Sequence, residues 1–389
     1  MTPIFRSIAV LIVGLFAGGQ TAAADKIPEN FNMEIVRKFA RESVFGLAWS
    51  PDGRYLAAES GGGEGYVVWD VQTGKNIREL KSPYGPWAGT GDLSFTPDGK
   101  HLIVLPHEAV FNDGGQRVAF ALWNIQTGEI DRKIVLPDVD GGVSHRKLAH
   151  YGISSAAQRM AVVYGGEGGS RKIHIYDTQT WDVINTAIDI RRSMPPRAFA
   201  FSGNGHLVAI GDMVPEAYDG TPQGMIWIYR VEDGRLIKTI ERAHANIVAH
   251  LAFAQNEKLL VSAASQYGKQ LNPLTGLLDT FRDGDPVRIW DILTGAKVAS
   301  LNAETGAATS LAVNSDGTLV AFGGATKING APGLYHIWNP GNTGPPLVID
   351  GMREGTYAAA FHPNRQAVAI HGRRGIWSAE VLVLQLKSK

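Results

Sequence analysis

Histidines and carboxylates are the residues of this sequence that could do metal or acid–base chemistry, but their spacing forms no recognised motif. The chain has 11 His and no Cys, which excludes disulfides, thiolate zinc sites and a Cys nucleophile. No His-x-x-x-His, His-Glu-x-x-His or Gly-x-Ser-x-Gly pattern occurs. One set could be gathered by neighbouring loops around a metal: His107, His145 and His150 with Glu108 or Asp113. Three loop histidines among eleven are expected by chance, so we predict no metal, no cofactor and no catalytic residue.

Aromatic residues among Pro, Gly and acidic residues are better candidates for binding. Aromatic side chains bury a large area at little entropic cost, and Arg offers planar donors to carboxylates. The predicted partner-binding residues are Trp87, Phe111, Tyr218, Tyr267, Phe281 and Arg282. The alternative role of each is to fold its own loop onto the body of the protein. Two glycine-rich stretches, 61–65 and 165–169, have no helix expected after them, so we interpret them as hairpin loops and not as phosphate sites.

A repeat supplies the elements that must position these residues. One half is an alternating apolar run with a Pro-Asp-Gly turn, as in GLAWSPDGRYLAAES (46–60) and DLSFTPDGKHLIVL (92–105). The other half is a β-rich run ending in an aromatic residue and a Thr-Gly turn, as in YVVWDVQTGK (66–75) and VRIWDILTGAK (287–297). Seven first halves recur about every 50 residues, which is typical of a β-propeller blade of four strands. Asp-Gly and Asn-Gly supply the positive φ of primed hairpin turns, which we therefore predict, and the Asp or Asn side chain is expected to bond the backbone two residues on.

The predicted fold is therefore all-β, a seven-bladed β-propeller of four-stranded antiparallel blades. Residues 32–40 form a lone strand before the first unit, and the last unit has only three strands. We expect the N-terminal strand to close the last blade, because an open ring would leave unpaired strand edges. Six or eight blades are the alternatives. The repeated aromatic residues, Trp69 and Trp123 among them, are expected in the core.

The first 24 residues predict a signal peptide. Arg6 precedes an apolar run, Ile8 to Phe16, which is too short to span a bilayer, and small residues follow. We place cleavage after Ala24; an uncleaved anchor is the alternative. Residues 25–389 then form one propeller domain that is periplasmic or secreted, has no membrane span and is a monomer. The 37 basic and 37 acidic residues argue against a nucleic-acid partner.

The chain resembles WD-repeat propellers over nearly all of residues 25–389. The resemblance rests on Trp69-Asp70, Trp123-Asn124, Tyr176-Asp177, Trp290-Asp291 and Trp338-Asn339, each after the apolar residues of a third strand, and on the Asp-Gly turns. It implies a structural hydrogen-bond set in blade 5, made of His244, Ser262, Asp285 and Trp290. Elsewhere the loops that should carry the equivalent of His244 have Pro83, Pro137 and Pro195. The sequence is thus similar to a divergent bacterial member of exported type, and also to periplasmic propellers with a Tyr-Val-Thr-Asn-type repeat.

The resemblance implies that each blade's a–b and c–d turns lie on one face and its d–a and b–c connections on the other. The long connections fall in the second set, at about 106–117, 211–224, 265–285 and 323–333. Long loops cost little stability and often carry function. We therefore expect a non-catalytic protein–protein interaction scaffold that binds through this long-loop face. The alternatives are a propeller enzyme, of lactonase or dehydrogenase type, and a binder of a small ligand or glycan in the central funnel.

Overall fold

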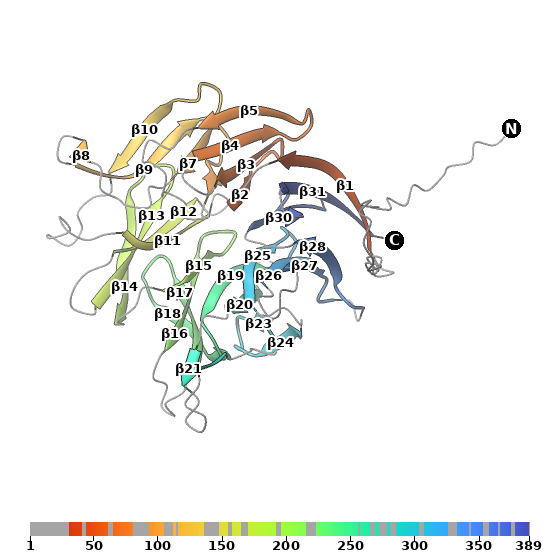
Figure 1. Cartoon of the computed structure of the whole chain (residues 1–389). Coiled ribbons are helices and arrows are strands. Elements are labelled where there is room, and N and C mark those ends of the chain that lie inside the picture. Colours follow the sequence, from red (N-terminus) through yellow and green to blue (C-terminus); the bar gives the residue numbers. More distant parts are fainter. Residues whose placement is uncertain are drawn as a thin grey trace.

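The computed structural model (Figure 1) shows a ring of antiparallel sheets. The structure describes residues 31–40, 44–60, 65–80, 93–104, 112–113, 116–135, 148–154, 158–164, 170–191, 196–214, 223–255, 257–264, 269–271, 278–280, 285–302, 307–325, 333–341, 344–352, 358–364, 366–374 and 378–388. The predicted signal peptide lies outside these residues. Among them, no helix is long and apolar enough to cross a membrane.

Seven four-stranded blades follow one another along the chain, and strands a to d of each run from the axis outward. Blade 1 consists of β2 (Val44–Trp49), β3 (Tyr55–Ser60), β4 (Gly65–Asp70) and β5 (Lys75–Leu80). Blade 2 consists of β6 (Ser94–Phe95), β7 (His101–Val104), β9 (Gln116–Asn124) and β10 (Ile130–Val135). Blade 3 consists of β11 (Leu148–Ser154), β12 (Arg159–Tyr164), β13 (Ser170–Asp177) and β14 (Val183–Arg191). Blade 4 consists of β15 (Ala198–Phe201), β16 (Leu207–Val214), β17 (Gln223–Arg230) and β18 (Leu236–His244).

The remaining three blades complete the ring. Blade 5 consists of β19 (Val248–Ala254), β20 (Leu259–Ala264), β23 (Val287–Asp291) and β24 (Lys297–Leu301). Blade 6 consists of β25 (Ala307–Val313), β26 (Val320–Ala325), β27 (Gly333–Trp338) and β28 (Leu347–Met352). Blade 7 consists of β29 (Ala358–Phe361), β30 (Ala367–Arg374), β31 (Ser378–Ser388) and β1 (Phe31–Ala40). Three short strands lie in b–c connections: β8 (Asn112–Asp113), β21 (Lys269–Leu271) and β22 (Leu278–Thr280).

The N-terminal strand closes the ring, as predicted. Strand β1 pairs antiparallel with β31 from Phe31↔Ser388 to Ala40↔Glu380, with one irregularity after Ile35. It thereby becomes the outer strand of the last blade and covers an edge that would otherwise be unpaired. The ring of Phe39 stacks on Trp69 of blade 1 at 4.6 Å between centroids. The two ends of the described chain thus hold blades 7 and 1 together.

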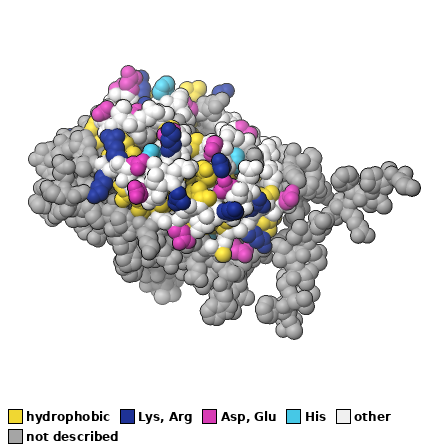
Figure 2. All heavy atoms as spheres, turned by 90° about the horizontal axis from the view of Figure 1, so that it is seen from above, with side chains coloured by type: hydrophobic (Ala, Val, Ile, Leu, Met, Phe, Trp, Pro, Cys, Tyr) yellow, Lys and Arg dark blue, Asp and Glu magenta, His cyan; other side chains and the backbone are white. Residues whose placement is uncertain are grey.

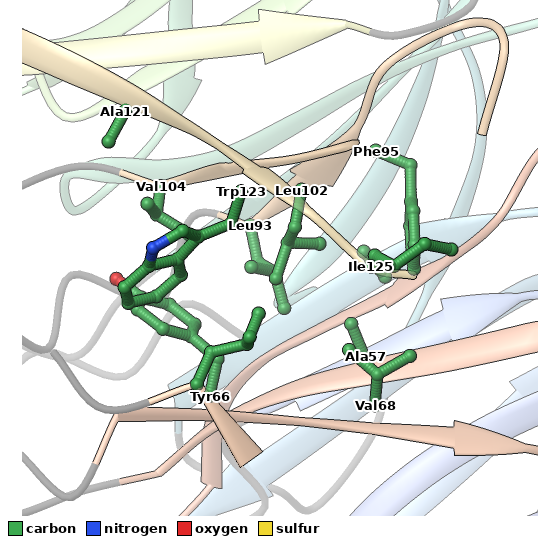
Figure 3. Packing of buried hydrophobic residues seen from close by; sticks show 12 residues of the cluster. Ala57, Tyr66, Val68, Leu93, Phe95, Leu102, Val104, Ala121, Trp123 and Ile125 are labelled. Carbon is green, nitrogen blue, oxygen red and sulfur yellow. The ribbon is translucent and has the colours of Figure 1, made fainter. Parts of the chain in front are cut away.

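The core consists of seven apolar clusters, and each cluster lies between two neighbouring blades. Figure 3 shows the one between blades 1 and 2, where Tyr66 and Trp123 face each other beside Leu93, Val104 and Leu102. The Tyr66 and Trp123 rings meet edge to face at 5.4 Å. Seven clusters at seven interfaces mean that no seam of the ring is left open.

Where strand c carries the repeated aromatic residue, its ring packs between that blade and the preceding one. Trp69 belongs to the cluster between blades 7 and 1, Trp123 to the next, and Trp290 and Trp338 to those between blades 4 and 5 and between 5 and 6. Each of the four is at most 6% exposed. Their predicted place in the core is confirmed.

The a–b turns differ from the predicted primed type. In blade 1 the Gly53 amide donates to the Ser50 carbonyl at 2.8 Å, which closes a turn over Pro51 and Asp52. Gly53 has a φ of +72°, whereas Asp52 is not among the positive-φ residues of the described chain. A primed type I′ turn needs positive φ at both central residues, so the prediction was wrong: this is a type I turn followed by a left-handed glycine. The Asp52 side chain accepts from Arg54 N at 3.0 Å, as expected.

A repeated contact joins the outer strand of one blade to the c–d turn of the next. Arg37 of β1 donates from Nε to Val71 O at 2.8 Å, and Arg78 of β5 donates to Gln126 O. Asn185 of β14 donates to Val231 O at 2.8 Å, and Lys238 of β18 donates to Thr294 O at 3.4 Å. We call these four side chains the clasp residues. Three of them occupy one repeat position, four residues after the residue that ends the c–d turn (Gly74, Trp181 and Gly234).

Charged side chains of both signs are interspersed on the surface. Figure 2 shows Lys and Arg beside Asp and Glu over the described part of one face, with small apolar areas between them. This mixture accords with the balanced composition of 37 basic and 37 acidic residues. A field of one sign, such as nucleic-acid binding requires, is not seen on the described part of that face.

Candidate functional site

The six predicted partner-binding residues lie in connections whose side chains fall outside the described residues. Strand bounds place Trp87 between β5 and β6, a d–a connection. The others lie in b–c connections: Phe111 in blade 2, Tyr218 in blade 4, and Tyr267, Phe281 and Arg282 in blade 5.

The long b–c connections are shorter than the sequence suggested in blade 4, because the strands extend further. Strand β16 continues to Val214 and β17 begins at Gln223. In blade 5 the connection contains its own hairpin, β21 paired with β22. Alternation of apolar residues predicts the middle of a strand. The ends of the strand depend on how far its backbone is hydrogen-bonded to a neighbouring strand, which the alternation does not show.

Blade 5 brings together three of the four residues of the implied hydrogen-bond set. His244, at the end of β18, lies with Nε2 2.8 Å from Ser262 Oγ on β20. Trp290 of β23 donates from Nε1 to the same Ser262 oxygen at 2.8 Å. The hydroxyl therefore links the blade 4 outer strand to two strands of blade 5. The Asp285 carboxylate lies 3.4 Å from Lys297 Nζ.

A serine 2.8 Å from a histidine is also the arrangement of an activated nucleophile and its base. Burial decides against that role for Ser262 here. Ser262 is 0% exposed and His244 1% exposed, so no substrate reaches the hydroxyl without opening the blade. The Trp290 indole also donates to that oxygen. The contact is a structural link, and leaving any of its buried polar groups unpaired would cost about 1–3 kcal/mol.

The d–a connection that follows His244 is anchored by further contacts. Asn246 is buried, and its carbonyl lies so close to Gly224 of β17 that a Cβ there would overlap it. Arg288 of β23 donates to Ala243 O at 2.6 Å. The d–a connection between blades 4 and 5 is thus held in place by buried contacts with both blades.

Carboxylates of the c–d turns are committed to their own turns. Asp70 accepts from Thr73 N at 2.8 Å, and this bond lowers the pKa of the Asp70 carboxyl; Asp291 accepts from Thr294 N at 2.7 Å with the same effect on its pKa. Within the described residues no group of three or more His, Asp or Glu side chains could hold a metal ion. The side chains of His107, His145 and His150, and of Glu108 and Asp113, lie outside the described set.

Sequence reasoning missed the clasp residues and the contacts at the ring closure. His362 of blade 7 lies with Nε2 3.1 Å from Gly53 O of blade 1, and Trp49 Nε1 donates to Ala360 O at 3.0 Å. A side-chain hydrogen-bond donor at one repeat position was a usable signal for Arg78, Asn185 and Lys238. No sequence signal pairs His362 with Gly53, because 309 residues separate them.

Fold, repeat and buried contacts together define the class of the chain: it is a seven-bladed β-propeller that resembles WD-repeat proteins. Residues 34–70 match the family described as WD domain, G-beta repeat. This stretch covers most of β1 and strands β2 to β4, so the sequence repeat begins on the outer strand of one blade and continues through three strands of the next.

Known proteins support the fold over a much longer stretch than the family match. An uncharacterised WD repeat-containing protein of Synechocystis sp. is 36% identical over 63 residues, which span 16% of this chain and 17% of that protein. The β-propeller domain of Myceliophteria thermophila Cps50 (Swd1) is similar with a TM-score of 0.59 at 14% identity, over 91% of this chain and 99% of that chain. A chain of the Mitotic Checkpoint Complex is similar with a TM-score of 0.62 at 13% identity, over 97% of this chain and 99% of that chain. At such identities the likeness to solved structures concerns the fold alone.

Proposed function

We propose that the protein is a non-catalytic interaction scaffold that binds a protein partner through its long-loop face. The fold is consistent with such a role. One observation carries the proposal: the connections differ in length by type. The a–b turns stay short, as at 50–54 and 202–206, whereas the b–c connection of blade 5 runs from 265 to 286. A ring closed at all seven interfaces presents such loops with little ordering cost.

The residues proposed to contact the partner are Trp87, Phe111, Tyr218, Tyr267, Phe281 and Arg282. Support comes from their types, since aromatic residues and Arg are enriched at interface hot spots. Their positions in the chain also support the proposal, because each lies in a d–a or b–c connection.

Affinity capture tests this proposal. Tagged wild-type protein is compared with a Trp87→Ala/Phe281→Ala variant, and with a control that alters two exposed turn residues of the other face, Gln126→Ala/Gln179→Ala. The proposal predicts that the loop variant loses at least one partner that both the wild type and the turn control retain. Recovery of the same partners by all three proteins would contradict it.

We also propose that the protein is exported. Support comes from the sequence of residues 1–24, with Arg6, an apolar run and the small residues that end at Ala24. Fractionation of cells that express the chain with a C-terminal tag is expected to place it outside the cytoplasm, with Asp25 as the first residue of the purified protein. A cytoplasmic protein with residues 1–24 intact would contradict export.

A further inference from the structure

Four exposed apolar side chains lie on the outer strands of blades 4 and 5 and on the c–d turn of blade 5. They are Leu236 (47% exposed), Ile237 (42%), Leu293 (85%) and Val298 (54%), and they are the exposed large apolar residues of the described chain. We call them the rim patch. Strands β18 and β24, which carry three of them, are the outermost strands of their sheets and lie on the same side of the ring in Figure 1.

A clasp joins the two halves of the rim patch into one surface. Lys238, next to Ile237, donates from Nζ to Thr294 O, next to Leu293, at 3.4 Å. The Lys238 stem also packs on the same turn, with Cδ 3.3 Å from where a Cβ would lie at Gly295. The blade 4 strand and the blade 5 turn are therefore in contact at the patch.

Leu293 is apolar at a turn position where the equivalent residues of other blades are polar. The equivalent residues are Gln72, Gln126, Gln179 and Glu232 in blades 1 to 4, all polar and all exposed. The turn itself is the same, since Gly74 and Gly295 donate to the carbonyls of Asp70 and Asp291, both at 2.8 Å. Folding thus does not require an apolar residue at this position, and the 85% exposed Leu293 points to contact with another molecule.

Charge around the rim patch indicates which molecule covers it. Segments 230–238 and 291–298 carry basic and acidic residues in nearly equal number: Arg230, Arg235, Lys238 and Lys297 against Glu232, Asp233 and Asp291. Arg230 pairs with Asp233 and Lys297 with Asp285 within one copy. Arg235 and Glu232 are left to face each other between two copies across a two-fold axis, so the patch complements itself. A chain with 37 basic and 37 acidic residues also has no long-range repulsion from its own copies. A strongly charged partner would find no such match.

We propose that the rim patch is the interface of a two-fold symmetric dimer of this chain. The proposal departs from the monomer expected from sequence alone. Four side chains offer only some hundreds of Å², far less than the roughly 2,000 Å² or more of an obligate dimer. The dimer is therefore weak and depends on concentration. If the proposed function also holds, dimerisation presents two partner-binding faces and gives avidity, but self-association does not rest on that function.

Sedimentation velocity of the purified chain tests the proposal, with loading concentrations from about 1 µM to about 200 µM. The wild type is expected to shift from monomer to dimer over this range. Leu293→Gln/Ile237→Thr is expected to raise the dissociation constant at least 10-fold. Gln is the native residue at the position of Leu293 in three other blades, so the variant should fold, and circular dichroism checks this.

Gln126→Leu is the matched control, because it places a single exposed Leu at the same turn position in blade 2. It is expected to associate as the wild type does. A wild type that stays monomeric at every concentration would overturn the proposal. A dissociation constant that the double variant leaves unchanged would also overturn it. So would a Gln126→Leu variant whose dissociation constant falls by as much as the loss of Leu293 raises it, because any exposed Leu would then promote association.

Discussion

Single residues make the contacts between blades 7 and 1, where the ring closes. Gly53 is one of them, and two features of its position require a glycine. Its φ of +72° is a left-handed conformation, and a Cβ at this position would overlap the imidazole of His362. Gly53→Ala is therefore expected to lower the free energy of unfolding by about 2–4 kcal/mol, from backbone strain and overpacking together. Urea unfolding measures the change.

Gly203 is the matched control for Gly53, since a Cβ there would meet nothing within 4 Å and its φ is not positive. Gly203→Ala should be neutral or stabilise the protein by a few tenths of a kcal/mol, to about 1 kcal/mol. Equal losses in the two variants would contradict the assigned contact with His362.

A buried histidine gives the stability a pH dependence of known sign. His336 is 5% exposed and stacks on Phe322 at 4.8 Å, and this burial lowers its pKa from 6.5 to about 4. Between these values the unfolded chain binds the proton and the folded protein does not. The free energy of unfolding therefore does not depend on this proton above pH 6.5, and it decreases as the pH falls from 6.5 toward 4.

Chemical unfolding at several pH values between 7 and 4.5 checks this prediction. His336→Gln should reduce the slope of unfolding free energy against pH in this window by up to about 1.4 kcal/mol per pH unit. Burial also lowers the pKa of His250 to about 4, so part of the slope should persist in the variant. An unchanged slope would mean that His336 does not stay neutral in the fold.

Residue types were predictable from the sequence where the repeat fixes them. The strand c aromatics and the Asp52 turn contact belong to this group. Contacts across the closure, such as His362 with Gly53, were not predictable, because they depend on how the ring closes and not on local pattern. The partner-binding residues remain a prediction, because they lie in loops where the repeat does not determine the position of a side chain.

At the scale of elements, the clasp residues stabilise neighbouring blades through the turns that they touch. Arg37 donates to the carbonyls of Val71 and Gln72, while the adjacent Lys38 of the same strand is exposed. Arg37→Met should cost about 1–2 kcal/mol of unfolding free energy through the lost charge-assisted bonds. Thermal unfolding would show this as a lower melting temperature, whereas Lys38→Met should change little. A loss of the same size in both variants would show that the Arg37 contacts with the blade 1 turn do not stabilise the ring.

Strand order and blade number followed from the sequence, but the turn type did not. Asp-Gly predicted positive φ at both residues, whereas Gly53 alone adopts it in blade 1. Ser50 and Pro51 explain the difference, because Pro favours negative φ at the first central position and the Ser50 carbonyl accepts the Gly53 amide. The dipeptide alone therefore does not identify the turn; its two preceding residues are needed.

For the whole molecule, the closed ring predicts that the chain tolerates a change of its ends. Ser388 pairs with Phe31, so the two ends of the described chain are adjacent. A circular permutant that joins them through a short Gly-rich linker and opens after Gly203 keeps β1 beside β31. Its expected melting temperature is within a few degrees of the wild type, by the usual tolerance of exposed turns. A permutant that does not fold would contradict the pairing of β1 with β31.

Site-specific photo-crosslinking tests partner binding through the long-loop face most directly. A crosslinking amino acid replaces Trp87 or Phe281 in one set of variants, and Gln126 or Gln179 of the short turns in the other. Binding through the long-loop face predicts that crosslinks to a partner protein form from the first set and not from the second. Crosslinks from the short turns alone would contradict it and would move the binding surface to the opposite face of the ring.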